Sequence, residues 1–331
     1  MDRDTRSRRL FLRTAGALAT TAVVPHAAWA QSPAASLRIL CSGPAGSIPD
    51  SVARRYAEQL GPRYPGGVVV DNRAGAAGQI AVGALKQAAP DGATVLLAQG
   101  AVATVYPYLY AKLGYDPVAD LRPVSVAAEA TLALAVGSAV PASVRTLADF
   151  IDWLRANPAL SNYGSPGPGT LPHVVSAMLF RETKVETQHV AYAGGPPAMV
   201  DLMGGRIASL VLPEGLLRPH QAAGKLRVLA TSGSARSAFM PDVPTFVEQG
   251  HPTLAIREWF GFFMPGSTAA AIVESASQSV KAAAENKAVS GALADMGMLA
   301  SSSTPSAMSE RIATEQRYWR DAINTTGIRV E

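Results

Sequence analysis

The sequence contains one cysteine and no long apolar segment. An internal disulfide would need a second cysteine, so the 331-residue chain has to be stable through its packed core alone. Apolar residues make up 48% of the chain, which is enough material for two cores. No later run approaches the roughly 18 apolar residues of a membrane-spanning helix. Cys41 ends a short apolar run, which favours a buried, hydrophobe-like role over a reactive thiol.

Outside residues 1–30, the chain has almost no excess of positive charge. Five of the 29 basic residues and two of the 25 acidic residues lie within positions 1–30. The remaining 24 basic and 23 acidic residues nearly cancel, so most of the formal charge of +4 belongs to the N-terminus. Without a basic stripe that could release counterions, we expect no binding to nucleic acid.

Familiar catalytic and metal-binding patterns are missing as well. Neither Ser47 nor Ser165 lies in a G-x-S-x-G elbow, and the segment after position 41 lacks both the P-loop lysine and the dinucleotide G-x-G-x-x-G. No two histidines beyond position 30 have the spacing of metal ligands. These histidines are His173, His189, His220 and His251. We therefore expect no enzyme activity, no cofactor and no metal; a hydrolase that uses Ser165 or Ser47 is the catalytic alternative.

The N-terminus has the order of an export signal. Arg8 and Arg9 lie in a basic segment, an apolar stretch follows at 15–24, and Ala28-Trp29-Ala30 has the A-x-A form of a cleavage site. The paired arginines indicate the twin-arginine route. We predict a signal peptide at 1–30 that is removed near Ala30, and a protein located in the periplasm. The alternative interpretation is a basic, disordered tail.

Beyond position 31, short apolar runs alternate with helical patterns. Strands are predicted at 37–41, 68–70 and 94–98, with helices at 52–60 and 79–88 between them. This β-α-β-α-β order predicts an α/β fold with a mostly parallel sheet and helices on both faces.

A second α/β region follows, and two β-rich segments are predicted to cross between the regions. The expected elements of this region are strands at 161–164, 186–190, 207–212 and 225–231 and helices at 174–181 and 198–203. The crossings are predicted at 124–136 and 259–264, after which only helical patterns remain, at 272–285, near 293 and at 306–323. We predict a discontinuous lobe one, 31–127 and 256–331, a lobe two, 128–255, and a cleft between them.

Three glycine-rich loops each follow a predicted strand and precede a predicted helix, at 42–50, 164–173 and 192–197. In a parallel α/β sheet such loops lie at the carboxyl ends of the strands, where ligands bind. The free amides of a helix start and the helix dipole favour an anion there. The loops are therefore predicted to bind a carboxylate or a phosphate, although tight corners of the fold would also need glycine.

Three side chains near these loops are candidates for the site, and two of them have two interpretations each. Asp50 lies in the first turn of a helix, where it either orders the loop or receives an amine or hydroxyl of the ligand. His173 begins a helix beside the second loop and either supports ligand and loop or has a plain capping and packing role. Glu214 follows a strand end and is a candidate for facing the cleft.

Motifs along nearly the whole chain after position 31 resemble those of the tripartite tricarboxylate transporter receptors, the Bug family of extracytoplasmic solute-binding proteins. The segments that carry the resemblance are 37–39, 43–46, 68–78, 90–94, 114–124, 163–165, 189–192, 201–205, 223–227, 241–245 and 259–261, together with Asp50, His173, Gly195, Pro197 and Ala198. The family resemblance implies a two-lobed periplasmic-binding-protein fold of type II, with a small organic acid bound between the lobes. It further implies that one loop from each lobe grips a carboxylate through backbone amides and ordered water.

From the loops and the resemblance together, we predict a monomeric receptor that captures a mono-, di- or tricarboxylate or an amino acid and delivers it to membrane permease subunits. The alternative is a ligand-dependent partner of a membrane sensor for the same acid. Cys41-Ser42 before the first loop and extra prolines in the second depart from the family pattern and bear on recognition of the ligand's far end. The predicted ligand-binding residues are Pro44, Ala45, Gly46, Ser47, Asp50, Ser165, Gly167, Gly169, Thr170, His173, Tyr192, Gly195 and Glu214.

Overall fold

One long strand, β4 (Leu121–Val136), takes part in two groups of strands, and the rest of the fold is arranged around it. The computed structural model describes residues 35–330, so the predicted signal peptide lies outside the described residues. The first sheet has the order β2-β1-β3-β9-β4, and β10 also pairs with β4. Its strands are β1 (Leu37–Cys41), β2 (Val68–Asn72), β3 (Thr94–Gln99), β9 (Arg257–Pro265) and β10 (Met298–Ala300).

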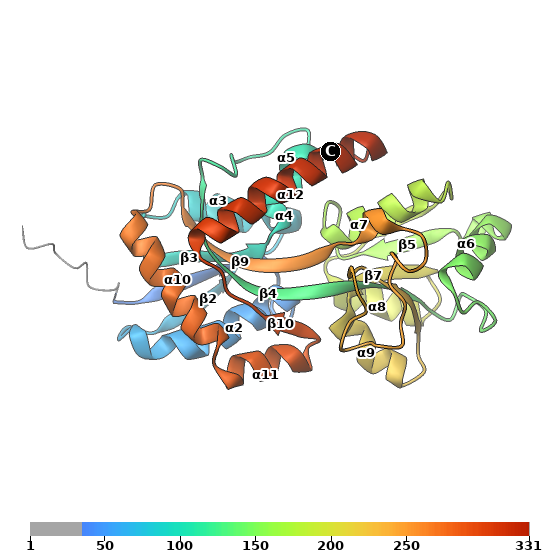
Figure 1. Cartoon of the computed structure of the whole chain (residues 1–331), viewed down its shortest axis with the longest axis horizontal. Coiled ribbons are helices and arrows are strands. Elements are labelled where there is room, and N and C mark those ends of the chain that lie inside the picture. Colours follow the sequence, from blue (N-terminus) through green and yellow to red (C-terminus); the bar gives the residue numbers. More distant parts are fainter. Residues whose placement is uncertain (1–34, 331) are drawn as a thin grey trace, which may run out of the picture. The chain divides into compact units, whose positions relative to one another are not determined.

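The second sheet has the order β4-β7-β5-β6, and β8 also pairs with β4. Its other strands are β5 (Asn162–Ser165), β6 (Gln188–Ala191), β7 (Ser209–Pro213) and β8 (Arg227–Thr231). Strand β4 changes partners at one point: Thr131 still pairs with β9, whereas Leu132 pairs with β7. Figure 1 shows β4 and β9 side by side through the middle of the molecule.

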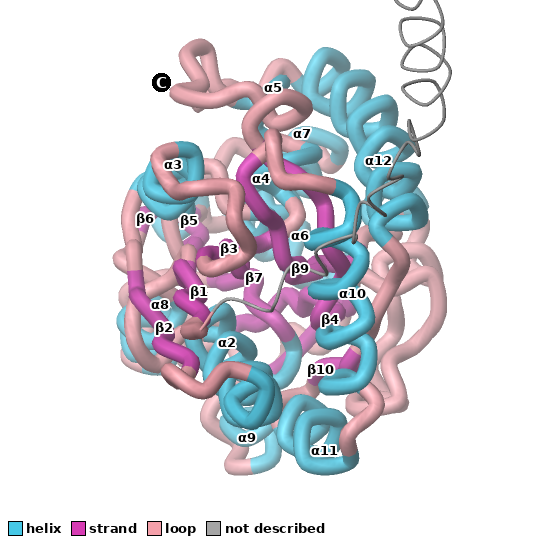
Figure 2. Tube along the Cα trace, turned by 90° about the vertical axis from the view of Figure 1, so that its left-hand side faces the viewer, coloured by secondary structure: helices cyan, strands magenta, loops and turns pink. Residues whose placement is uncertain are grey.

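Helices cover both faces of the first sheet because successive strand side chains point to opposite faces. Leu40 packs in the core that α3 and α12 complete, whereas Ile39 and Cys41 pack in the core that α2, α10 and α11 complete. Figures 1 and 2 show these two sets of helices on either side of the strands. The helices are α2 (Ile48–Leu60), α3 (Gln79–Lys86), α4 (Ala101–Thr104), α5 (Tyr106–Leu109), α10 (Ala270–Ala284), α11 (Lys287–Asp295) and α12 (Pro305–Thr326).

The second sheet is also covered on both faces. Helices α6 (Leu147–Ala156) and α7 (Leu171–Glu182) contribute to the core on one face. Helices α8 (Gly195–Met203) and α9 (Glu214–Ala222) contribute to the core on the other.

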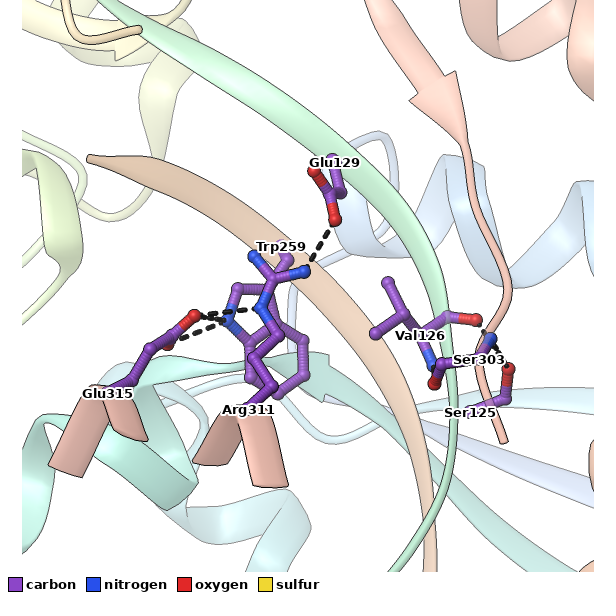
Figure 3. A network of polar contacts seen from close by, with 7 residues as sticks. All are labelled: Ser125, Val126, Glu129, Trp259, Ser303, Arg311 and Glu315. Carbon is purple, nitrogen blue, oxygen red and sulfur yellow. Dashed lines mark hydrogen bonds and ion pairs between the residues drawn. The ribbon is translucent and has the colours of Figure 1, made fainter. Parts of the chain in front are cut away.

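Helix α12 is fixed to both long strands by one arginine. The Arg311 guanidinium donates to Glu315 Oε1 at 2.8 Å and to Glu129 of β4. Its carbon lies 5.0 Å from the centroid of the Trp259 ring, and the indole N–H donates to Glu315 at 2.9 Å (Figure 3). Nearby, Ser303 exchanges hydrogen bonds with the Ser125–Val126 segment of β4.

The predicted β-α-β-α-β order of the first region is confirmed, since β1 pairs in parallel with β2 and with β3. The prediction of a mostly parallel sheet is wrong for the centre, where β9 pairs antiparallel with β3 and β4. The expectation that only helices follow the second crossing is also wrong, because the short strand β10 pairs with β4. The predicted lobe boundaries stay a prediction.

Candidate functional site

The first loop connects β1 to α2 and is shaped by Asp50. Gly46 has a φ of +78°, a conformation that glycine adopts without steric cost. Its amide donates to Asp50 Oδ2 at 2.9 Å, and Asn72 Nδ2 donates to Asp50 Oδ1 at 2.9 Å and to the carbonyl of Gly43 at 2.9 Å. Arg54 Nε donates to Asp50 Oδ2 at 3.0 Å. Of the two interpretations of Asp50, these contacts support the one in which it orders the loop.

The electrostatics of Asp50 agree with this role. Burial raises its pKa, but the hydrogen bonds from Arg54, Gly46 and Asn72 outweigh burial and lower the pKa below its usual value. The carboxylate therefore stays ionised at neutral pH. Within the described part of the chain, the amides of Ala45 and Ile48 donate no hydrogen bond, so they are available to a ligand.

The second loop connects β5 to α7, and several of its polar groups form hydrogen bonds within the loop or with His173. The amide of Gly169 donates to His173 Nδ1 at 3.1 Å, and the amide of Thr170 donates to the Gly167 carbonyl at 3.3 Å. The Thr170 hydroxyl donates to the same carbonyl at 2.8 Å. Among residues 35–330, no acceptor is present for the amide of Leu171. The predicted binding by Gly169 and Thr170 would therefore require these internal bonds to be exchanged.

Two histidines lie behind this loop. The rings of His173 and His189 stack with centroids 4.0 Å apart, and the Tyr163 ring stacks against His189 at 5.0 Å. Because His173 Nδ1 accepts the Gly169 amide, its proton is on Nε2. Burial and the neighbouring His189 lower the pKa of His173 to about 4, and burial lowers the pKa of His189. Of the two interpretations of His173, the contact with Gly169 favours the one in which the histidine holds the loop in place.

Ser165 lies at the end of β5, and its hydroxyl is 2.7 Å from His189 Nε2. The same hydroxyl is within 3.0 Å of the Gly167 carbonyl, and the residue has no exposed surface. Nucleophilic catalysis would need a third group that orients the histidine. In residues 35–330, no carboxylate forms a hydrogen bond with His189. The pair therefore has the geometry of a structural contact.

The third loop, between β6 and α8, lies against the second. The amide of Tyr192 donates to the Ser165 carbonyl at 3.0 Å, and the amide of Gly194 donates to the Pro166 carbonyl at 3.0 Å. The Tyr192 hydroxyl donates to Asp201 of the following helix α8 at 2.9 Å, so it already has a partner within the protein. The amides of Ala193 and Gly195 have no acceptor among the described residues.

A tyrosine connects the second loop to the helices of the first sheet. Tyr110, directly after α5, donates to the Pro168 carbonyl at 3.1 Å. A side chain at Gly169 would bring its Cβ to 2.1 Å from the Tyr110 hydroxyl, so glycine is required at this contact. On the other side, Gln99 at the end of β3 accepts from Ser42 at 2.8 Å, which places β3 beside the first loop. The carboxyl ends of β1 and β3 therefore lie at the first loop, and the loop after β5 is bound to the segment after α5.

A cavity of about 200 Å³ lies beside these elements. Gln99 of β3 and Leu171 of α7 both line it, so it adjoins both loop regions. Its remaining wall comes from α4, from the start of β9 and from α12. The lining residues are Gln99, Gly100, Ala101, Thr104, Val105, Leu171, Ala255, Ile256, Arg257, Glu258, Trp259, Thr314, Glu315, Tyr318 and Trp319.

Glu214 and Cys41 lie apart from this cavity. Glu214 begins α9, is buried, and accepts from the Ser237 hydroxyl at 2.6 Å. Burial raises its pKa, and the Ser237 contact and the charges of Arg257 and Arg218 oppose this shift. Cys41 is fully buried, and burial raises its pKa to about 11, which confirms the hydrophobe-like role.

Within positions 35–330, no three histidine, cysteine, aspartate or glutamate side chains lie close enough together to hold a metal ion. No helix in this part of the chain is long and apolar enough to cross a membrane.

The fold is that of the two-lobed periplasmic binding proteins. The R. palustris protein Rpa4515, solved with adipate, has a TM-score of 0.82 and 28% identity, covering 88% of this chain and 97% of that one. MatC from Rhodopseudomonas palustris, solved with bound malate, has a TM-score of 0.79 and 26% identity, covering 87% and 98%.

The family follows from the sequence comparison. Residues 52–328 match the model of the tripartite tricarboxylate transporter family receptors, TctC, and the chain belongs to this family. The protein BugT of Bordetella pertussis is 29% identical over 323 residues, which cover 97% of each chain. The resemblance seen in the sequence motifs is thereby confirmed. The family is one of substrate-binding receptors.

Sequence patterns missed three features of the site. The stacking of His173 on His189 depends on the register of β5 with β6, which no local pattern reveals. The position of Glu258 in the cavity depends on which face of β9 turns inward. Gln99 had a usable signal, because it directly follows a predicted parallel strand and precedes a glycine.

Proposed function

We propose that the protein is an extracytoplasmic receptor that captures a small carboxylate and delivers it to the permease of a tripartite tricarboxylate-type transporter. The family membership supports the transport role. The adipate and malate bound in two related structures support a small organic acid as ligand. The observation on which the proposal rests is the set of unpaired amides at three strand-to-helix loops, one of which, that of Leu171, belongs to a residue that lines the cavity.

These amides are sufficient in number for useful affinity. A hydrogen bond to a charged group contributes about 1.5–3 kcal/mol. Micromolar binding requires about 8 kcal/mol, which four or five such contacts supply before the cost of closure is subtracted. The amides available in the described chain are those of Ala45, Ile48, Leu171, Ala193 and Gly195. Bridging water would let the ligand reach those that are too far for direct contact.

The roles of the predicted site residues follow from their contacts. We assign the ligand's carboxylate to the first loop, Pro44, Ala45, Gly46 and Ser47, where the free amides are those of Ala45 and the following Ile48, with Asp50 as the residue that positions the loop. We assign the opposite side of the ligand to the second and third loops, from Ser165 to Thr170 and at Gly195. His173 and Tyr192 are positioning residues, because both already bind within the protein.

The setting of this receptor is also part of the proposal. We assign residues 1–30 to a twin-arginine signal peptide removed near Ala30, and the remaining chain to the periplasm as a monomer without catalytic activity. Lobe one would comprise 31–127 and 256–331, and lobe two 128–255. The partner switch of β4 at Thr131 and Leu132 supports a boundary in this part of the chain.

Thermal unfolding in the presence of small acids tests the binding function. We expect at least one of succinate, adipate, malate, citrate, aspartate and glutamate to raise the melting temperature, because a ligand that binds only the folded state stabilises it. The matched dimethyl esters should have no effect, since they lack the anionic oxygens. No shift with any acid at millimolar concentration, or equal shifts with acid and ester, would contradict the proposal.

A further inference from the structure

Glu258 is a buried carboxylate that lacks a partner. It is the second residue of β9, pairs with Ala130 of β4, and is 8% exposed. Glu258 is one of the residues that line the 200 Å³ cavity. No hydrogen bond or ion pair of its carboxylate occurs in the described part of the chain. Burial raises the pKa of Glu258 to about 7, as expected for an acid without compensating contacts.

The other acids near this cavity, Glu315 and Glu129, already have partners. Glu315 accepts from the Trp259 indole and from Arg311 Nε, and Glu129 accepts from the other end of the same guanidinium (Figure 3). Two carboxylates thus share one arginine, and Glu258 adds a further negative charge when it is ionised. Arg311, which holds these two acids, is therefore not free to pair with Glu258.

We propose that Glu258 recognises the ammonium group of the ligand, so that the preferred ligands carry both a carboxylate and a primary amine. This inference rests on the proposed function, in which the loops hold the carboxylate. An ammonium group supplies three donors to a carboxylate that has no other partner. The rings of Tyr318 and Trp319 line the same cavity, and aromatic faces attract cations.

The dimensions of the cavity agree with this assignment. A volume of about 200 Å³ is well above the roughly 10–15 Å³ that one water molecule needs, so a small organic molecule can enter. Two residues of the wall adjoin the loops: Gln99 accepts a hydrogen bond from Ser42 of the first loop, and Leu171 begins the helix after the second. The inference requires a ligand that reaches from these loops to Glu258.

The groups around Glu258 determine how binding depends on pH. Arg257 also lines the cavity, and its charge opposes the rise in the pKa of Glu214. Glu315 is paired with Arg311. Burial raises the pKa values of Tyr106 and Tyr318, so both stay neutral near pH 7. Glu258 is thus the group near the cavity whose charge changes around pH 7.

Calorimetric titration with matched ligand pairs tests the inference. The pairs are succinate with aspartate, adipate with 2-aminoadipate, and butanoate with 4-aminobutanoate, and putrescine serves as an amine without a carboxylate. We expect the amine-bearing member of at least one pair to bind tenfold or more tightly than its partner. Glu258→Gln should abolish this difference and leave the amine-free acid unchanged. Glu310→Gln, which removes an exposed carboxylate of α12, should preserve it.

The wild-type protein gives a second test that needs no variant. Affinity for the amine-bearing acid should rise between pH 6 and pH 8, because the ionised form of Glu258 binds the ammonium, whereas affinity for the amine-free acid should not rise. Tighter binding of amine-free acids, with affinity that increases as pH falls, would mean that protonated Glu258 donates to the ligand and would overturn the inference. Unchanged pair selectivity in Glu258→Gln would overturn it as well.

The two proposals fail in different ways. If acids bind but amine-bearing acids have no advantage, the receptor function stands and the assignment of Glu258 falls. If no acid binds but putrescine does, in a manner that Glu258→Gln abolishes, the carboxylate proposal falls and the ammonium site stands. If neither acids nor putrescine bind, both are wrong.

Discussion

The amide of Ile48 offers a direct test of carboxylate binding by main-chain groups. Ile48 is the first residue of α2, and its amide has no acceptor within the described chain. Proline is tolerated at the first position of a helix, because the amide there has no intrahelical partner. The preceding residue, Ser47, has φ −78° and ψ 168°, which is the conformation that a following proline favours. Ile48→Pro therefore removes one N–H with little change in the backbone.

The expected effect follows from the energy of one charge-assisted hydrogen bond. Loss of about 1.5–3 kcal/mol weakens binding roughly 10- to 150-fold. Both Ile48→Pro and the control Ile48→Ala lose the buried isoleucine side chain, so the ratio of their dissociation constants isolates the amide. Calorimetric titration with the acid that gives the largest thermal shift measures this ratio, and circular dichroism checks that both variants are folded. Equal dissociation constants for the two variants would refute the role of this amide.

Two further predictions concern stability. In urea unfolding, Gly100→Ala should lower the free energy of unfolding by about 1–3 kcal/mol, because its Cβ would lie 2.0 Å from the Trp259 ring. The control Gly83→Ala, on an open face of α3, should raise it by about 0.5–1 kcal/mol. Acidification from pH 6.5 toward about 4 should lower the free energy of unfolding by up to about 1.4 kcal/mol per pH unit through His173, because the unfolded state takes up the proton first. His173→Gln should reduce this slope; an unchanged slope would contradict the assignment.

Local sequence signals predicted most of the elements but not all of them. The alternation of short apolar runs and helical periods located β1, α2, β2, α3 and β3 to within a few residues. Helix α6 was missed although Thr146 and Asp149 form a capping box, which is a readable signal. Strand β10 is only three residues long and exists because β4 offers it an edge, so its own sequence contains too little pattern to reveal it.

The site was predictable in its loops and not in its interior. Glycine and proline before a helix marked all three loops, since these residues act through local backbone geometry. The inward turn of the second loop depends on a histidine ring that accepts the Gly169 amide, which is a contact across a helix start. Whether Glu258 faces a cavity or a partner depends on strand pairing, which brings together residues that are far apart in sequence.

The internal bonds of the loops have a consequence for binding. Asp50 fixes the first loop through three donors, and His173 fixes the second through the Gly169 amide. Each loop is therefore ordered before a ligand arrives, and the entropy of ordering it is not subtracted from affinity. The amides of Ala45, Ile48 and Leu171 take no part in these bonds and remain unpaired within the described chain. A small number of neutral donors can then bind an anion at useful strength without an arginine ligand, and the carboxylate of Glu258 can discriminate among anions by what else they carry.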